Sequence, residues 1–256
     1  MTRAAARTIF IAIVTISVLT LISYTHELLT RFEFYRSLHR RHPWYMVESI
    51  DKLLGLLICA TAIHILFRRG PIPVVNELAL TRSPAVGFGF ALLATSPMLV
   101  GFAATRRIAL DSNPPELIFL TLFSPLVEEI EYRGYGFRQL MLRAGWPFWF
   151  AVIPPAVLFG QGHIEKGASL QDMTELFLIT AIGAVTFSWL LYRWQNLWVP
   201  IACHILMNLW WALFSVSRSA IGGWFPFALQ AASVTAAILL TLLWTNAPAT
   251  QFANAV

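Results

Sequence analysis

The last long apolar stretch of the sequence spans residues 224–244 and reads WFPFALQAASVTAAILLTLLW. It contains no charged side chain, and its length matches the about 20 residues that an α-helix needs to cross the hydrocarbon core of a bilayer. Transmembrane barrel strands are shorter and alternate apolar with polar residues, so this run does not fit a strand. The stretch therefore predicts a membrane-spanning helix.

Seven further apolar stretches of similar length occur earlier in the sequence. They cover residues 8–24, 50–67, 86–105, 117–135, 148–164, 176–192 and 197–216. We therefore expect an all-α fold, a polytopic integral membrane helical bundle with about eight transmembrane helices. No remaining segment is long enough for a separate soluble domain, so residues 1–256 are expected to form a single transmembrane domain.

The composition supports a location in a lipid bilayer. Apolar residues make up 57% of the chain and charged residues 12%, whereas about a quarter of a typical soluble domain is charged. This balance excludes an ordinary soluble enzyme, a disordered regulator and a nucleic-acid-binding domain. The net charge of +5 comes mainly from arginines between the apolar stretches, where they are expected to anchor helix ends against lipid headgroups.

Ionisable residues occur inside the fourth apolar stretch, which reads PLVEEIEYRG over residues 125–134. Each such group costs about 2.5–3.5 kcal/mol to insert into a bilayer, so a functional role is the first hypothesis. Glu129 and Arg133 are four residues apart and share a helix face, where they can form an ion pair. Glu128 points to a different face and, without that partner, is expected to act as a proton acceptor. The alternative is a charged helix end at the membrane interface.

Two further pairs of candidate residues lie in later stretches. Phe159 and His163 are four residues apart, so the aromatic ring can form a wall beside the imidazole. His204 and Asn208 have the same spacing and are expected to converge on one point, as donors to an oxyanion would. The alternative is an interfacial histidine for the first pair and interhelical hydrogen bonding for the second.

Other charged residues in the apolar stretches are expected to be structural or have no assigned role. Glu48 and Lys52 are four residues apart at the start of the second stretch, which predicts an ion pair at a solvated helix entrance. Glu131 is an additional acid between Glu129 and Arg133, and the pattern assigns it no role.

A carboxylate, two imidazoles and an amide from three helices fit the needs of a hydrolase. Glu128 with His163 can deprotonate a water molecule. His204 with Asn208 can donate hydrogen bonds to the oxyanion that forms at a scissile carbonyl. Alternatively, Glu128, His163 and His204 can hold a zinc ion whose bound water attacks the carbonyl. The residues themselves serve either mechanism.

The three motifs together resemble a known family. Glu-Glu-x-x-x-Arg, Phe-x-x-x-His and His-x-x-x-Asn occur in this order within about 80 residues, each on a predicted membrane helix. This order is similar to the signature of the CPBP family, which includes CAAX prenyl proteases, bacteriocin-processing and self-immunity proteins, and related bacterial membrane endopeptidases. The resemblance covers residues 86–216, which are expected to form the catalytic core.

The resemblance implies a role for each motif residue. The expected catalytic residues are Glu128, His163, His204 and Asn208. The expected supporting residues are Glu129, Arg133 and Phe159. Members of the family have been described both as metalloproteases and as glutamic proteases without a metal. A helix with His and Asn at this spacing makes a better donor pair than a zinc pair, so we expect no cofactor, with zinc as the alternative.

The expected function is that of an intramembrane endopeptidase that hydrolyses a membrane-associated protein or peptide. The compact chain is typical of bacterial members, so we expect it in the bacterial inner (plasma) membrane. The motifs of other intramembrane proteases, His-Glu-x-x-His, Gly-x-Ser-Gly and Gly-x-Gly-Asp, do not occur in the sequence. A proton-coupled transporter is one alternative, although no internal repeat supports it. A non-catalytic immunity or scaffold protein is the other.

Overall fold

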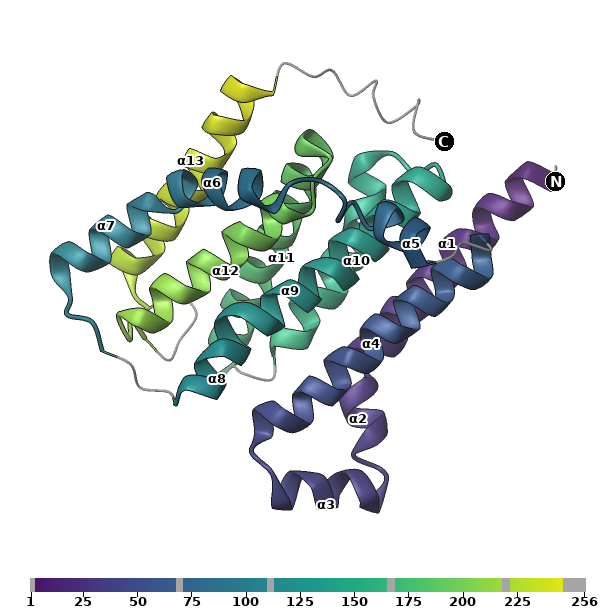
Figure 1. The fold of residues 1–256 in the computed structure, drawn as a ribbon, viewed down its shortest axis with the longest axis horizontal. Coiled ribbons are helices and arrows are strands. Elements are labelled where there is room, and N and C mark those ends of the chain that lie inside the picture. Colours follow the sequence, from purple (N-terminus) through teal and green to yellow (C-terminus); the bar gives the residue numbers. More distant parts are fainter. Residues whose placement is uncertain (1–2, 68–70, 110–112, 165–168, 218–221, 246–256) are drawn as a thin grey trace.

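The computed structural model describes residues 3–67, 71–109, 113–164, 169–217 and 222–245. All regular elements within these ranges are helical, and Figure 1 shows them packed as a bundle. The structure therefore confirms the predicted all-α fold.

The helices of the first half of the chain are α1 (Arg3–Ser23), α2 (Thr25–Leu29), α3 (Glu33–Arg41), α4 (Trp44–Phe67), α5 (Pro71–Glu77), α6 (Pro84–Ala94) and α7 (Ser96–Thr105). A central helix follows, built from α8 (Pro114–Ile118), η1 (Phe119–Phe123), α9 (Ser124–Glu128), η2 (Glu129–Phe137) and η3 (Gln139–Arg143). The last helices are α10 (Phe148–Ile164), α11 (Leu170–Trp194), α12 (Trp198–Leu213) and α13 (Trp224–Trp244).

Each of the eight predicted stretches coincides with helical structure, but the helices differ in how well they match a bilayer. Among the described residues, α1, α4, α11 and α13 are long and apolar enough to cross a membrane. The pair α6 and α7 adds a fifth candidate if its two helices form one bent span. The apolar helices α10 and α12 are shorter, with 17 and 16 residues. The protein is thus an integral membrane helical bundle.

The bend between α6 and α7 measures 48° and falls at Thr95. Pro97 in the first turn of α7 cannot donate a backbone hydrogen bond, and its ring disfavours a straight continuation of the preceding helix. The hydroxyl of Thr95 donates to the carbonyl of Ala91 at 2.8 Å, and it accepts a hydrogen bond from Nε1 of Trp210 at 2.9 Å. The bend is therefore held in place by α12.

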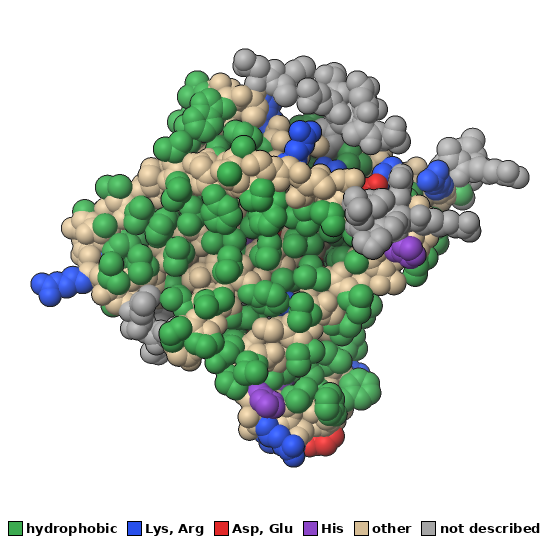
Figure 2. Space-filling model, in the orientation of Figure 1, with side chains coloured by type: hydrophobic (Ala, Val, Ile, Leu, Met, Phe, Trp, Pro, Cys, Tyr) green, Lys and Arg blue, Asp and Glu red, His purple; other side chains and the backbone are tan. Residues whose placement is uncertain are grey.

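The outer surface of the bundle is largely apolar. Figure 2 shows hydrophobic side chains over most of the face in view, with charged side chains mainly toward its edges. Many large apolar residues are exposed on the candidate spans, such as Leu57 on α4, Ile182 on α11 and Leu243 on α13. A surface of this kind fits contact with lipid rather than with water.

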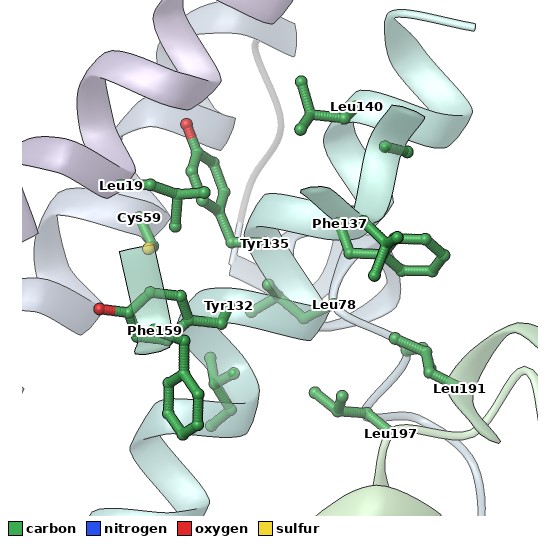
Figure 3. Close-up of a cluster of buried hydrophobic side chains, with 14 of the residues drawn as sticks. Leu19, Cys59, Leu78, Tyr132, Tyr135, Phe137, Leu140, Phe159, Leu191 and Leu197 are labelled. Carbon is green, nitrogen blue, oxygen red and sulfur yellow. The ribbon is translucent and has the colours of Figure 1, made fainter. Parts of the chain in front are cut away.

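The central helix runs through the interior of the bundle. All nine residues of η2 are buried, which is the pattern of a helix surrounded on every side. Figure 3 shows part of this core, where Tyr132, Tyr135 and Phe137 of η2 lie near Leu19 of α1 and Leu191 of α11. The segments η1, η2 and η3 have π-helical hydrogen bonding, which is rare and often found at functional sites.

The helices around the centre bring distant parts of the sequence together. α4 packs against α9 and η2, α10 packs against η2 and α11, and α12 packs against η1 and α9. The start of α12 is fixed by hydrogen bonds to the segment before α6: the backbone N–H of Leu197 donates to the carbonyl of Ala79, and Nδ2 of Asn196 donates to the carbonyl of Ser83. The second half of α9 therefore lies between α4 and α12.

Two short helices between α1 and α4 were not predicted. α2 and α3 project beyond the bundle at the bottom of Figure 1. Tyr35 of α3 is buried against α4, where its hydroxyl donates a hydrogen bond to Asp51. Burial and the nearby carboxylate raise the pKa of Tyr35 well above its usual value. This contact ties α3 to the start of α4.

Candidate active site

A cavity of about 840 Å³ opens beside the central helix. Its lining includes every residue predicted to be catalytic, together with two of the predicted supporting residues. They are Glu128, His163, His204, Asn208, Arg133 and Phe159. These side chains come from α9, η2, α10 and α12, so the structure brings the three sequence motifs to one place.

Glu128, at the end of α9, has two polar contacts on the same oxygen. Its Oε1 lies 2.8 Å from Nζ of Lys52 and accepts a hydrogen bond from the hydroxyl of Ser124 at 2.7 Å. Glu128 therefore has a basic partner, Lys52, that the sequence pattern did not predict. The placement of Lys52 at a solvated helix entrance is wrong, because its side chain is only 20% exposed and pairs with Glu128 across helices.

Glu129, the first residue of η2, is fully buried and has two partners. Its Oε1 lies 3.2 Å from Nη1 of Arg133, as the four-residue spacing predicts. The same oxygen lies 2.9 Å from Nδ1 of His204. An ionised carboxylate can only accept hydrogen bonds. Nδ1 of His204 therefore carries a proton and donates a hydrogen bond to Glu129. The Glu129 carboxylate thus fixes the orientation of the His204 ring.

The two adjacent glutamates approach the same imidazole from different sides. Oε2 of Glu128 is 4.0 Å from Nε2 of His204, on the opposite edge of the ring from the contact with Glu129. The prediction that Glu128 and Glu129 have different roles rested on their different helix faces. A π-helix has more residues per turn than an α-helix, so neighbouring side chains are separated by a smaller angle. This geometry helps both carboxylates to reach His204.

Arg133 is 1% exposed and lies between aromatic rings. Its guanidinium carbon is 4.4 Å from the centre of the Phe159 ring and 5.7 Å from that of Phe187. The negative face of an aromatic ring attracts a cation, so these contacts add to the ion pair with Glu129. Phe159 therefore supports Arg133 as well as forming part of the cavity wall.

His163 lies in the last turn of α10 with its ring 4.7 Å from that of Phe159, centre to centre. Its Nδ1 donates to the carbonyl of Phe159 at 2.8 Å, a common arrangement for a histidine at the carboxyl end of a helix. The proton on Nδ1 makes Nε2 the nitrogen that can accept another proton. The imidazole of His163 also interacts electrostatically with Glu128.

Asn208 follows His204 by one turn on α12, and both residues line the cavity. The side-chain nitrogen of Asn208 donates to the carbonyl of Leu120 at 3.2 Å, whereas Nδ1 of His204 donates to Glu129. These two contacts have different acceptors. The two side chains therefore line the same cavity, as their spacing predicts, but they do not bind a common acceptor.

The zinc alternative requires Glu128, His163 and His204 to coordinate one metal ion. No three His, Cys, Asp or Glu side chains in the described part of the chain lie close enough together to hold a metal ion. Glu128, His163 and His204 therefore do not form a ligand set in this arrangement. In addition, Oε1 of Glu128 faces an ammonium group, which is an unsuitable neighbour for a metal ligand.

The sequence pattern did not identify Lys52, Ser124 or the position of Glu131 as parts of the site. A lysine inside an apolar stretch was a signal, but Glu48, four residues earlier, was taken as its partner. Glu131 is buried behind the site, and its Oε1 closely approaches the position that a Cβ on Gly55 would occupy. Gly55 therefore leaves room for this buried carboxyl group.

The fold and the cavity together define a polytopic helical membrane protein with a glutamate–histidine site at its centre. The family model of type II CAAX prenyl endopeptidases, Rce1-like, matches residues 111–210. A Bacillus subtilis (strain 168) protein named "Putative membrane peptidase YdiL" is 35% identical over 99 residues. This match covers 39% of the present chain and 36% of the relative, so the chain spans about a third of that protein's length. No solved structure shows significant similarity.

These comparisons support the resemblance that the three motifs predicted: residues 111–210 of this chain are similar to the Rce1-like family and to a bacterial membrane peptidase. The matched region contains the central helix, α10, α11 and most of α12, and therefore all the predicted site residues. The helices α1 to α7 and α13 lie outside it. The similarity to a bacterial membrane protein supports a bacterial inner membrane as the location.

Proposed function

We propose that the protein is an intramembrane endopeptidase that hydrolyses a peptide bond of a membrane-associated protein or peptide. One observation carries this proposal: Glu128, His163, His204 and Asn208 line a single cavity in the interior of a membrane helical bundle. A buried carboxylate next to two imidazoles and an amide provides a base and hydrogen-bond donors in one place. The family match supports the same class of activity.

In the proposed reaction, Glu128 accepts a proton from a water molecule as the water oxygen attacks the scissile carbonyl carbon. The carbonyl oxygen becomes an oxyanion, which the side-chain amide of Asn208 stabilises, together with Nε2 of His204 when both ring nitrogens of His204 carry a proton. The proton on Glu128 then passes to the leaving nitrogen as the carbon–nitrogen bond breaks. His163 assists by holding the attacking water through its Nε2. The products are a new carboxyl terminus and a new amino terminus.

The supporting residues act on His204 and on the shape of the cavity. Glu129 accepts a hydrogen bond from Nδ1 of His204 and keeps the ring oriented toward the cavity. Arg133 pairs with Glu129, and Phe159 packs against both Arg133 and His163. Loss of any of these contacts is expected to reduce the rate of hydrolysis by misplacing a reacting group rather than by removing it.

The test compares membranes of bacterial cells that express the wild-type chain or Glu128→Gln. New peptide termini in the membrane fraction are identified by mass spectrometry. We expect termini that depend on the wild-type chain, and we expect Glu128→Gln and His163→Ala to reduce them by a factor on the order of 10²–10⁴, which is typical of a lost general acid–base catalyst.

The matched control is Glu33→Gln, which makes the same carboxyl-to-amide change on the exposed surface of α3. This variant is expected to produce the wild-type termini. If Glu128→Gln inserts normally and yields the same termini as the wild-type chain, the proposed activity is wrong, and a transport or scaffold role gains support.

We further propose that the reaction needs no metal. The support is that Glu128 contacts Lys52 and Ser124, and His204 directs Nδ1 to Glu129. The measurement is elemental analysis of the purified, active protein, together with activity after dialysis against a chelator. Activity is expected to persist without stoichiometric zinc. Loss of activity on chelation and its recovery on addition of zinc would favour the metalloprotease mechanism.

A further inference from the structure

Lys52 belongs to α4, which lies outside the segment that matches the family, yet it contacts the central carboxylate of the site. Its Nζ is 2.8 Å from Oε1 of Glu128, and its side chain is 20% exposed. Whereas Ser124 and Glu128 are among the residues that line the cavity, Lys52 is not. Lys52 therefore contacts Glu128 from α4 without being part of the cavity lining.

We propose that Lys52 and Ser124 are positioning residues that hold Oε1 of Glu128 and reserve Oε2 for the reaction. This inference rests on the proposed function. The two donors contact the same oxygen, at 2.8 Å and 2.7 Å. The other oxygen, Oε2, faces His204, with 4.0 Å to Nε2. The two carboxylate oxygens thus have different environments, one facing fixed donors and one facing the catalytic imidazole.

The energetic cost of burying Lys52 supports a specific role. An ammonium group in a membrane segment is unfavourable, and a partner carboxylate within hydrogen-bond distance offsets this cost. A lysine that only balanced the charge of Glu128 would not need a second donor on the same oxygen. Ser124, one helical turn before Glu128, supplies that donor at 2.7 Å, and two donors on one oxygen favour a single orientation of the carboxylate.

Other charged groups also surround the pair. His163 on α10 and His204 on α12 face Glu128 from the cavity side, and Glu131 interacts electrostatically with Lys52 from within the central helix. Lys52 therefore interacts with two carboxyl groups, and it contacts Glu128 directly at 2.8 Å. The ammonium group stabilises the carboxylate that it contacts, and a carboxylate is the form of Glu128 that can accept a proton from water.

The first experiment needs no substrate. Infrared spectra of the full chain in lipid nanodiscs are recorded at neutral pH, and the bands of Glu128 are assigned by difference from Glu128→Gln. We expect the carboxylate bands of Glu128 in the wild-type protein. In Lys52→Met we expect these bands to decrease and a carboxylic-acid C=O band to appear, because an uncompensated carboxylate is poorly stabilised in the interior.

Two further variants separate charge from position. Lys52→Arg keeps the charge and is expected to retain the carboxylate bands. Ser124→Ala keeps the ion pair but removes one donor, so we expect the carboxylate to persist with shifted stretching frequencies. Arg31→Met is the matched control, since it removes one positive charge from the exposed turn between α2 and α3 and should leave the spectrum unchanged.

The second readout is the pH profile of the Glu128-dependent cleavage found in the cellular experiment. Lys52→Met is expected to lower kcat and to move the rising limb of the profile to higher pH, with little change in KM, because Lys52 does not line the cavity. A variant that was merely destabilised would lose active protein without moving the profile.

The inference is overturned if Lys52→Met and Ser124→Ala both leave the Glu128 bands as they are in the wild-type protein. That result is distinct from a failure of the proposed function. The infrared bands report the ionisation state of Glu128 whether or not the protein cleaves a peptide. If Glu128→Gln produced the same peptide termini as the wild-type chain in cells, only the proposed peptidase activity would be rejected. If Lys52→Met does not fold, unchanged Glu128 bands in Ser124→Ala overturn the inference, and shifted bands support it.

Discussion

The side chain of Arg133 is the most completely enclosed cation at the site. It is 1% exposed, and its ion-pair partner Glu129 is fully buried. A buried ion pair gains little over a well-packed apolar pair, but a single buried charge without a partner is strongly unfavourable. The stability of the central helix is therefore expected to depend on the presence of both groups or of neither.

Arg133→Met and the double variant Glu129→Gln/Arg133→Met are expected to differ in their free energy of unfolding. We expect Arg133→Met to lower the free energy of unfolding by about 3–5 kcal/mol, because it leaves the Glu129 carboxylate without its cation. The double variant should be less destabilised than Arg133→Met alone. The measurement is unfolding in detergent, and an additive effect of the two changes would contradict the expected coupling.

Contacts within one helix were predictable from the sequence, whereas contacts between helices were not. The spacing of Glu129 and Arg133 predicted their ion pair, and the spacing of Phe159 and His163 predicted that their rings would be adjacent. The ion pair of Lys52 and Glu128 joins residues on different helices. No periodicity in the sequence indicates which face of α4 meets α9, so a partner of Lys52 nearby in the sequence was preferred.

At the scale of helices, the contact between α6 and α12 depends on Gly87. This glycine is buried, and a Cβ added to it would lie 2.5 Å from the backbone carbonyl carbon of Trp198. Backbone atoms at the start of α12 cannot move away easily, because Leu197 and Trp198 are hydrogen-bonded to residues 79 and 80. The absence of a side chain at Gly87 therefore sets how closely these helices pack.

Gly87→Ala and Gly89→Ala are expected to differ in stability. Gly87→Ala is expected to lower the free energy of unfolding by about 1–3 kcal/mol, as overpacking does in other interiors. Gly89 lies on the same helix with no atom within 4 Å of an added Cβ, so Gly89→Ala should leave stability unchanged or raise it by up to about 1 kcal/mol. Thermal unfolding of both variants in detergent provides the measurement. Equal effects would show that the close contact is not limiting.

The central helix shows what apolar periodicity can and cannot predict. The stretch 117–135 was expected to be helical, and it lies within the continuous helix formed by α8, η1, α9, η2 and η3. Its π-helical segments were not predicted, because the change from one hydrogen-bond register to another leaves no mark in the apolar pattern. The π-helical segment η2 begins at Glu129, which contacts His204, so the missing information concerns the site itself.

For the whole molecule, composition was the most informative feature. A chain with 57% apolar residues must place most of its surface in lipid, and the all-helical architecture follows from the need to satisfy backbone hydrogen bonds there. The order of helices around the centre did not follow from composition. It depends on specific contacts, such as Trp210 with Thr95 and Asn196 with the carbonyl of Ser83, that join distant parts of the chain.

The position of Lys52 on α4 has a consequence for biosynthesis. A nascent chain enters the membrane from its amino terminus, so α4 is inserted before the central helix has been made. During that interval the ammonium group lacks its carboxylate and is expected to remain near the headgroups, where water solvates it. Arrival of Glu128 then allows α4 to move to its final depth. Formation of the site is therefore expected to depend on the order in which α4 and the central helix are synthesised.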